Sequence, residues 1–169
     1  MRSREAVALV RELTVTNFDK KFNSAFSLIA FTVNRHLIRH MRRLQTEFGM
    51  DLQTTYVWGV LAHLNLSGVV HPLEANDTLL DSNGRLTVDL AAVSALSLAQ
   101  VAGLPRETVR RKLEHLEALG KVERDERKRW KVSKSGIDEK TVEFTRQTVI
   151  ELLRTAEMVN KLLDLHKAP

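Results

Sequence analysis

The chain has 169 residues, of which 43% are hydrophobic and 28% are charged, proportions typical of a soluble globular protein. It contains no cysteine, which excludes disulfides and thiolate metal sites, and we recognise neither a secretory signal nor an apolar run long enough to span a membrane. Positive charge is concentrated in residues 1–50 (net +5) and 105–131 (net +4), against a net of −4 in residues 51–104, which is consistent with either a polyanionic partner or a solvated basic surface.

Two helices are predicted in the first part of the chain. Over residues 20–48, apolar side chains recur at spacings of three and four from Phe22 to Phe48, as on an amphipathic helix. Gly49 follows as the expected stop of this helix. A second, shorter helix is predicted over residues 52–66.

The middle of the chain is predicted to begin with irregular structure and then to become helical. Residues 67–87 are rich in turn-forming side chains and indicate a loop or a hairpin. Within them, Asn83 and Gly84 fit a two-residue hairpin turn between short strands. From residue 89 to residue 120 the pattern is helical and apolar-rich.

The last part of the chain is predicted to contain a hairpin and a long helix. Residues 121–133 alternate charged and apolar side chains, which indicates two short strands. Residues 138–166 form a helical pattern in which Val142, Val149 and Ala156 lie one heptad apart. Together with the first helix, this helix carries more apolar surface than a small core can cover.

A helix-turn-helix is indicated between residues 98 and 113. Such a motif crosses two helices at close range through a tight turn. Ala99 supplies a small residue where the helices pack, and Gly103 tolerates a positive φ in the turn. Pro105 fits the start of the second helix, where a missing amide hydrogen has no partner to lose. The second helix then exposes arginines and a glutamate, which can bond guanine and cytosine in the major groove.

The run that begins at Pro105, Pro-Arg-Glu-Thr-Val-Arg-Arg, resembles the recognition helix of the cyclic-AMP receptor protein superfamily, whose Arg-Glu-Thr-Val-x-Arg pattern contacts bases. The resemblance implies that Arg106, Glu107 and Arg111 face base edges and that Thr108 contacts a phosphate. It does not extend upstream, because that family carries a glycine-rich β-roll where this chain is predicted to be helical.

The segment after the second helix is similar to the wing of the multiple-antibiotic-resistance (MarR) regulator family, in which an Asp-x-Arg element lies at the hairpin. The resemblance implies that Arg127 enters the minor groove, that Asp125 orients it, and that Lys128 and Arg129 contact phosphates. Long helices on both sides of the motif also match that family, which dimerises through its terminal helices.

Lys112 departs from the cyclic-AMP receptor pattern, where an apolar residue is usual.

We therefore expect a mainly α protein containing an α+β winged helix, that is, a helix-turn-helix with a small β-hairpin wing flanked by long N- and C-terminal helices. The expected parts are an N-terminal dimerisation region (1–50), a winged helix-turn-helix domain (51–136) and a C-terminal dimerisation helix (137–169). The expected function is sequence-specific regulation of transcription by a cytoplasmic homodimer on double-stranded DNA, with no enzymatic activity, cofactor, metal or membrane partner. The expected DNA-binding residues are Arg106, Glu107, Thr108, Arg110, Arg111, Lys112, Arg127, Lys128 and Arg129.

Other functions remain open at this point. They are a winged-helix protein-interaction module, a plasmid or phage replication or partition factor, and a sensor that holds a small-molecule effector in an apolar cavity between the terminal helices and the winged domain. Residues 35–43 contain four Arg, two His and no acid, and they indicate either a contact with DNA phosphates or a solvated helix face. His36 and His40 have the spacing of metal ligands, but the neighbouring arginines repel a cation.

Overall fold

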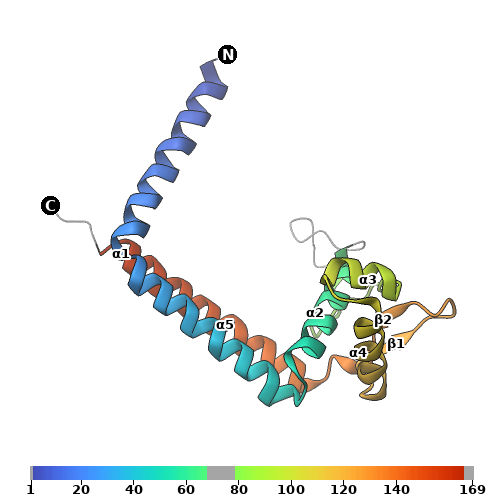
Figure 1. Ribbon diagram of the computed structural model, residues 1–169. Helices are drawn as coiled ribbons and strands as arrows, with labels where there is room; N and C mark the ends of the chain where they lie inside the picture. Colours follow the sequence, from blue (N-terminus) through green and yellow to red (C-terminus); the bar gives the residue numbers. More distant parts are fainter. Residues whose placement is uncertain (1, 68–78, 166–169) are drawn as a thin grey trace. The chain divides into compact units, whose positions relative to one another are not determined.

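The computed structural model describes residues 2–67 and 79–165, with side chains from residue 17 onward. The protein is mainly helical, and the described residues contain one small two-stranded antiparallel sheet (Figure 1). The elements in chain order are α1 (Arg2–Phe48), α2 (Leu52–Ser67), α3 (Ala95–Ala102), α4 (Arg106–Ala118), β1 (Val122–Arg124), β2 (Trp130–Val132), the short 3-10 helix η2 (Lys134–Gly136) and α5 (Glu139–Leu163). None of the helices described is both long and apolar enough to cross a membrane.

The chain divides into two compact units. The end unit combines residues 1–43 with residues 144–169, and therefore contains most of α1 and of α5. The central unit comprises residues 44–143 and contains α2, α3, α4 and the β1–β2 hairpin.

Several predicted elements are confirmed and two are corrected. Helix α1 ends before Gly49, which has a φ of +66°, but it begins far upstream of residue 20. The helical pattern predicted from residue 89 to residue 120 starts too early, because residues 89–94 are not helical and Val93 forms a β-bridge with Trp130; α3 begins at Ala95. The two predicted short strands are β1 and β2, with Val122 opposite Val132.

The predicted two-residue hairpin turn at Asn83 and Gly84 is a longer turn in the structure. The carboxylate of Asp81 accepts hydrogen bonds from the backbone N–H groups of Asn83 (2.8 Å) and Arg85 (2.9 Å), and Leu80 forms a single β-bridge with Leu86. The side chain of Asp81 thus organises a wider loop than the Asn-Gly pair alone predicts. The rest of the predicted loop, residues 68–78, lies outside the described residues.

The core of the central unit is built by α2, α3 and α4, with the hairpin closing one side. Its fully buried apolar side chains are Val57, Leu61, Leu98, Val109, Leu113 and Leu116. Val122, Trp130 and Val132 pack against them from the two strands. Because three elements share these side chains, the position of α4 is fixed by apolar packing against both α2 and α3.

A buried amide joins α2 to the strand region. The side chain of Asn65 is completely buried. Its Nδ2 donates to the carbonyl oxygens of Ala91 (2.7 Å) and Trp130 (3.3 Å), and its Oδ1 accepts from the backbone N–H of Val132 (2.9 Å). This one buried side chain therefore bonds three backbone groups from two separate segments.

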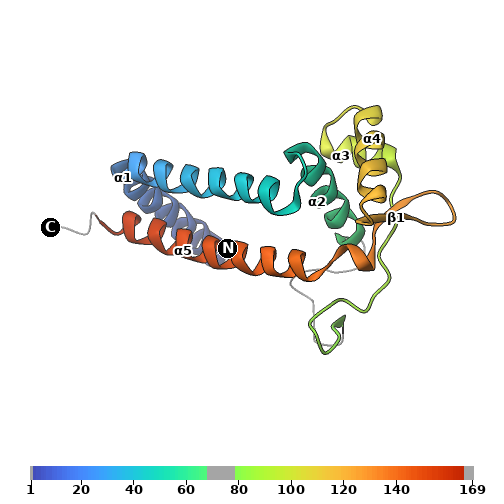
Figure 2. The same cartoon turned by 90° about the horizontal axis from the view of Figure 1, so that it is seen from below.

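In the end unit, α1 and α5 run antiparallel and side by side (Figures 1 and 2). Lys21 pairs with Asp164 (3.0 Å), His36 Nδ1 lies 3.2 Å from Thr155 Oγ1, and Arg43 donates to the carbonyl of Phe144 (3.3 Å), so the contacts cross in reverse order along the two helices. The buried side chains described here are few and mostly small: Ala25, Ile29, Thr32 and Phe144.

The Asn65 network predicts a large stability loss on truncation. Asn65→Ala should lower the free energy of unfolding by about 2–4 kcal/mol, because the carbonyl of Ala91 and the N–H of Val132 lose this partner, the carbonyl of Trp130 keeps only the bond from the N–H of Val93, and a small void remains. Chemical denaturation followed by far-UV circular dichroism measures this loss. His63→Ala removes an exposed side chain from the same helix and should change stability little. Equal effects of the two variants would contradict the proposed role of the amide.

Candidate nucleic-acid interface

The turn between α3 and α4 is set by three local features. The Oγ of Ser94 accepts from the backbone N–H of Ser97 (3.0 Å) and begins α3. Gly103 ends α3 in the left-handed conformation at φ +63°, which disfavours residues with a Cβ. Pro105 occupies the position before Arg106 with φ −56°, and α4 starts there. The predicted roles of Gly103 and Pro105 in this turn are confirmed.

The exposed start of α4 carries both free and paired charges. Arg110 Nη2 donates to Glu107 Oε1 (2.5 Å), and Nη1 of Arg110 contacts Glu114. This hydrogen bond from Arg110 lowers the pKa of Glu107. Arg106 and Arg111 are exposed, and neither forms an ion pair with any residue that the structure describes. The first two turns of α4 therefore present two uncompensated guanidinium groups beside a neutralised pair.

Lys112 turns away from this surface and into the fold. Its Nζ lies 2.8 and 2.9 Å from the two carboxylate oxygens of Asp51, and its side chain is only 16% exposed. Asp51 also accepts from the N–H of Thr54 (2.9 Å) in the first turn of α2. The aliphatic stem of Lys112 can thus pack where an apolar residue is usual, while its ammonium ties α4 to α2. We leave Lys112 out of the candidate interface for this reason.

Asp125 organises the tip of the β1–β2 hairpin. One carboxylate oxygen accepts from the backbone N–H groups of Arg127 (3.0 Å) and Arg129 (2.7 Å), and the other accepts from Arg129 Nε (2.9 Å). Asp125 therefore holds the backbone of Arg127, whereas the only side chain that it is seen to bond among the described residues is that of Arg129. Arg127 and Lys128 are exposed and form no ion pair among the residues described.

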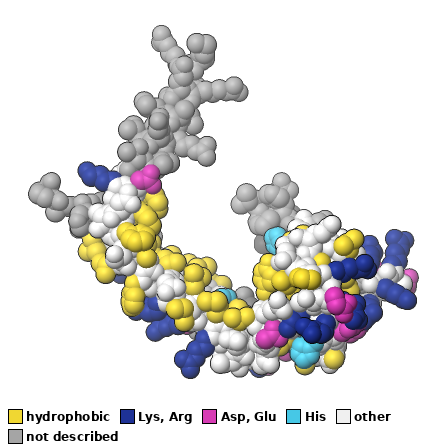
Figure 3. Space-filling model, viewed as in Figure 1, with side chains coloured by type: hydrophobic (Ala, Val, Ile, Leu, Met, Phe, Trp, Pro, Cys, Tyr) yellow, Lys and Arg dark blue, Asp and Glu magenta, His cyan; other side chains and the backbone are white. Residues whose placement is uncertain are grey.

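Most other cations on the hairpin are neutralised within the fold. The guanidinium of Arg124 lies 4.2 Å from the ring centroid of Trp130 and pairs with Glu117 of α4 (2.8 Å). Lys131 pairs with Glu123 on the neighbouring strand (3.1 Å). Lys and Arg side chains gather on the hairpin in Figure 3, and those at its tip are the ones left without an acid.

Sequence reasoning missed the partners of several predicted site residues. Arg110 pairs with Glu107 and Glu114 at the i,i+3 and i,i+4 spacings of a helix, and this spacing is a signal in the sequence that could have predicted both pairs. The pairing of Lys112 with Asp51 joins residues 61 positions apart, and no sequence signal predicts it. Thr108, predicted to contact a phosphate, is partly buried on the first turn of α4.

The contact between Lys112 and Asp51 predicts a pH-dependent contribution to stability. The hydrogen bond from Lys112 holds the pKa of Asp51 well below its usual range. A carboxylate whose pKa is lower in the folded state stabilises the fold above its unfolded pKa of about 4, and the contribution disappears as the pH falls further. Asp51→Asn keeps a helix-capping side chain and should cost about 1 kcal/mol at pH 7, a modest value because Asp51 is half exposed.

Denaturation of both proteins between pH 7 and pH 3 checks this contribution. The difference in unfolding free energy between the wild type and Asp51→Asn should shrink toward the acid end. Asp89→Asn, a change at an exposed carboxylate, serves as the control. A difference that stays constant over the whole range would contradict the charge-based explanation.

Comparisons with known proteins provide no functional assignment, so any proposal of function rests on the residues of this chain. No protein-family model, no curated protein and no solved structure matches this chain.

Proposed function

We propose that the protein binds double-stranded DNA in a sequence-specific manner and regulates transcription. In this proposal α3, the turn at Gly103 and α4 act as a helix-turn-helix, and the β1–β2 hairpin acts as a wing. The support is a short helix ended by a left-handed glycine, a following helix packed on a shared apolar core, and an antiparallel hairpin attached to that second helix through Glu117 and Arg124.

The observation that carries the proposal is the division between paired and unpaired cations. Arg110, Lys112, Arg124 and Arg129 are each held by a carboxylate of the same unit. Among the lysines and arginines of residues 106–132, those left without an acid in the described part of the chain lie at the start of α4 and at the hairpin tip, and they are Arg106, Arg111, Arg127 and Lys128. Unpaired charges add nothing to folding, and the helix N-terminus contributes further positive potential beside Arg106. Both features suit a phosphate backbone.

Separate roles follow for the two groups of cations. Arg106 and Arg111 project from the leading turns of α4, where a recognition helix contacts base edges in the major groove. Arg127 and Lys128 stand at the end of a narrow hairpin, which suits the minor groove and its flanking phosphates. Glu107 is available to cytosine only if its bond to Arg110 is exchanged or shared, and we assign it a secondary role.

A protein-interaction module is the second candidate function. It is favoured by two apolar side chains on α3, Leu96 and Val101, which are 50% and 55% exposed. They lie on the first helix of the proposed motif, and a partner covering them would not need the free arginines of α4. Because isolated exposed leucines and valines are common on protein surfaces, we rank this function below DNA binding.

We further propose that the active species is a homodimer formed through the end unit. Side chains three, four or seven residues apart form an apolar line along α1, and the same is true of α5. The α1 line consists of Phe26, Val33, Leu37 and Met41, and the α5 line of Val142, Val149 and Leu152, all between 39% and 54% exposed. Exposed stripes of this length are uncommon on monomers, and a second copy offers a matching pair of lines. Four helices would then share a core that two helices lack.

The DNA-binding proposal is tested by selecting bound sites from random duplexes and measuring affinity for the selected and for an unrelated sequence. Arg106→Ala or Arg111→Ala should cost about 1–3 kcal/mol on the selected site and less on the unrelated one. Arg127→Ala should weaken both and reduce the slope of log affinity against log salt by about 1. Arg85→Ala, in the turn organised by Asp81, is the control. Failure to enrich any site, or equal losses on both sequences for all variants, would count against sequence-specific binding.

The dimer proposal is tested by sedimentation equilibrium. The wild type should sediment at twice the chain mass of 19.2 kDa at micromolar concentration, whereas Val149→Asp and Leu152→Asp should sediment as monomers, because a carboxylate cannot be buried unpaired between apolar helices. Lys161→Gln changes the net charge by the same amount, loses only the pair with Glu157, and should remain dimeric. A wild-type protein of single-chain mass would overturn the proposal.

A further inference from the structure

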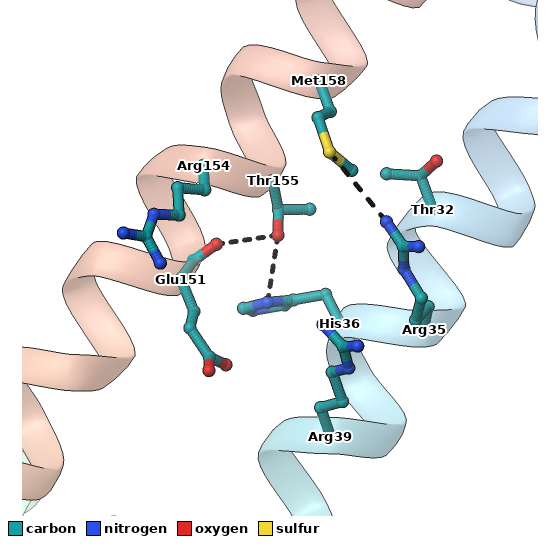
Figure 4. Close-up of a pocket in the computed structure, with 8 residues that line it drawn as sticks. All are labelled: Thr32, Arg35, His36, Arg39, Glu151, Arg154, Thr155 and Met158. Atoms are coloured by element: carbon teal, nitrogen blue, oxygen red, sulfur yellow. Dashed lines mark hydrogen bonds between the residues drawn. The ribbon is translucent and has the colours of Figure 1, made fainter.

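The geometry points to a binding site for a small dianion, of the phosphate or dicarboxylate class, between α1 and α5 in the end unit. A cavity of about 170 Å³ lies there (Figure 4). Its charged lining consists of Arg35, Arg39 and Arg154, with a single carboxylate, Glu151. The inference concerns the end unit alone and does not depend on DNA binding by the central unit.

The arginines of the cavity are not neutralised by the protein. Arg39 and Arg154 come from opposite helices, and neither forms an ion pair with any residue that the structure describes. Arg35 is held in place by neutral groups, because its guanidinium lies 5.7 Å from the ring centroid of Phe31 and its Nη2 lies 3.9 Å from Met158 Sδ. Planar guanidinium groups recognise carboxylates and phosphates through paired hydrogen bonds, and two of them on facing helices suit a ligand with two negative charges.

Polar groups of the seam complete the lining. Thr155 Oγ1 donates to the carbonyl of Glu151 (2.7 Å), so its contact with His36 Nδ1 at 3.2 Å requires the proton to be on His36. The neighbouring ring of His40 has a lowered pKa, caused first by burial and then by the positive charges of His36 and Arg43, with Glu151 acting in the opposite direction. Three guanidinium groups line the cavity against one carboxylate, so its charged lining is net positive.

A cation is a poor occupant of the same space. The rings of His36 and His40 stack with centroids 6.3 Å apart, but three guanidinium groups surround the cavity. Within the described part of the chain, no cluster of three or more His, Cys, Asp or Glu side chains is arranged to hold a metal ion. The sensor left open by the sequence analysis would hold its effector in an apolar cavity between the terminal helices and the winged domain, whereas this cavity lies within the end unit and three arginines line it.

The cavity remains accessible in the proposed dimer. Arg35 and Arg39 are offset by two residues from the apolar line through Val33, Leu37 and Met41, which places them about 200° away around α1. The apolar line is thus on the flank of α1 opposite to these arginines. A second copy that covers the apolar flank leaves the arginine flank open to a ligand.

Isothermal titration calorimetry on the full chain tests the site, with inorganic phosphate and succinate as probes and sodium chloride at equal ionic strength as the blank. We expect saturable binding of at least one of the two probes, with one site per chain. Arg39→Gln combined with Arg154→Gln should weaken it by about tenfold for each guanidinium lost. Lys20→Gln combined with Lys161→Gln removes the same charge from α1 and α5 outside the cavity and should leave binding unchanged. Circular dichroism confirms that each variant is folded.

Two outcomes would overturn the inference. One is the absence of saturable heat with either probe, and the other is equal weakening by the two double variants, which would indicate general charge attraction. If neither probe binds but Arg39→Gln with Arg154→Gln lowers affinity for random duplex DNA, the arginines serve the DNA backbone, and the small-anion site is rejected. Because the titration contains no DNA, its result stands apart from the test of sequence-specific binding.

Discussion

The buried amide of Asn65 is the interaction on which the rest of the central unit depends. It holds the end of α2 against the segment at Ala91 and against β2, through three hydrogen bonds made by a fully buried side chain. Once β2 is fixed, Trp130 is fixed, and the guanidinium of Arg124 packs over its ring while reaching Glu117 on α4. An unbroken series of contacts therefore leads from one core side chain to the relative placement of α4 and the hairpin, the two elements that carry the unpaired cations.

Charge is used in two ways in this unit, and the distinction follows from position. Where a cation lies next to the core, as Lys112 does, an acid just before another helix pairs with it, since a largely buried ammonium is costly without a partner. Where a cation stands at an element's tip, as Arg127 does, water solvates it and the fold is indifferent to it. Unpaired charge is thus tolerated wherever water reaches it, as at Arg85 and Lys134 among the described residues. The DNA proposal rests instead on which elements carry Arg106, Arg111, Arg127 and Lys128, namely α4 and the hairpin.

How far the sequence predicts this structure depends on the range of the interaction concerned. Apolar spacing predicts α2 and α5 closely, and Gly103 with Pro105 predicts the turn before α4, because these signals act over a few residues. The network of Asn65 and the bond between Asp51 and Lys112 join distant positions, and an asparagine within a helix has no pattern that marks it as buried. The resemblance implies that Asp125 orients Arg127. In the structure Asp125 accepts from the backbone N–H of Arg127, but the guanidinium that it bonds is that of Arg129.

In the end unit, the sequence predicts the helices clearly, but few side chains are buried between them. Two helices meeting along Ala25, Ile29 and Thr32 bury little, and the seam also contains polar contacts such as that of His36 with Thr155. Small side chains and hydrogen-bonded polar groups allow close approach, but they supply little of the hydrophobic free energy that holds helix pairs together. The large apolar side chains, Leu37 and Leu152 among them, lie outside the seam. In the dimer that we propose, a second copy would cover that flank, so folding of the end unit would be coupled to its assembly, and the polar seam would be left for the proposed ligand.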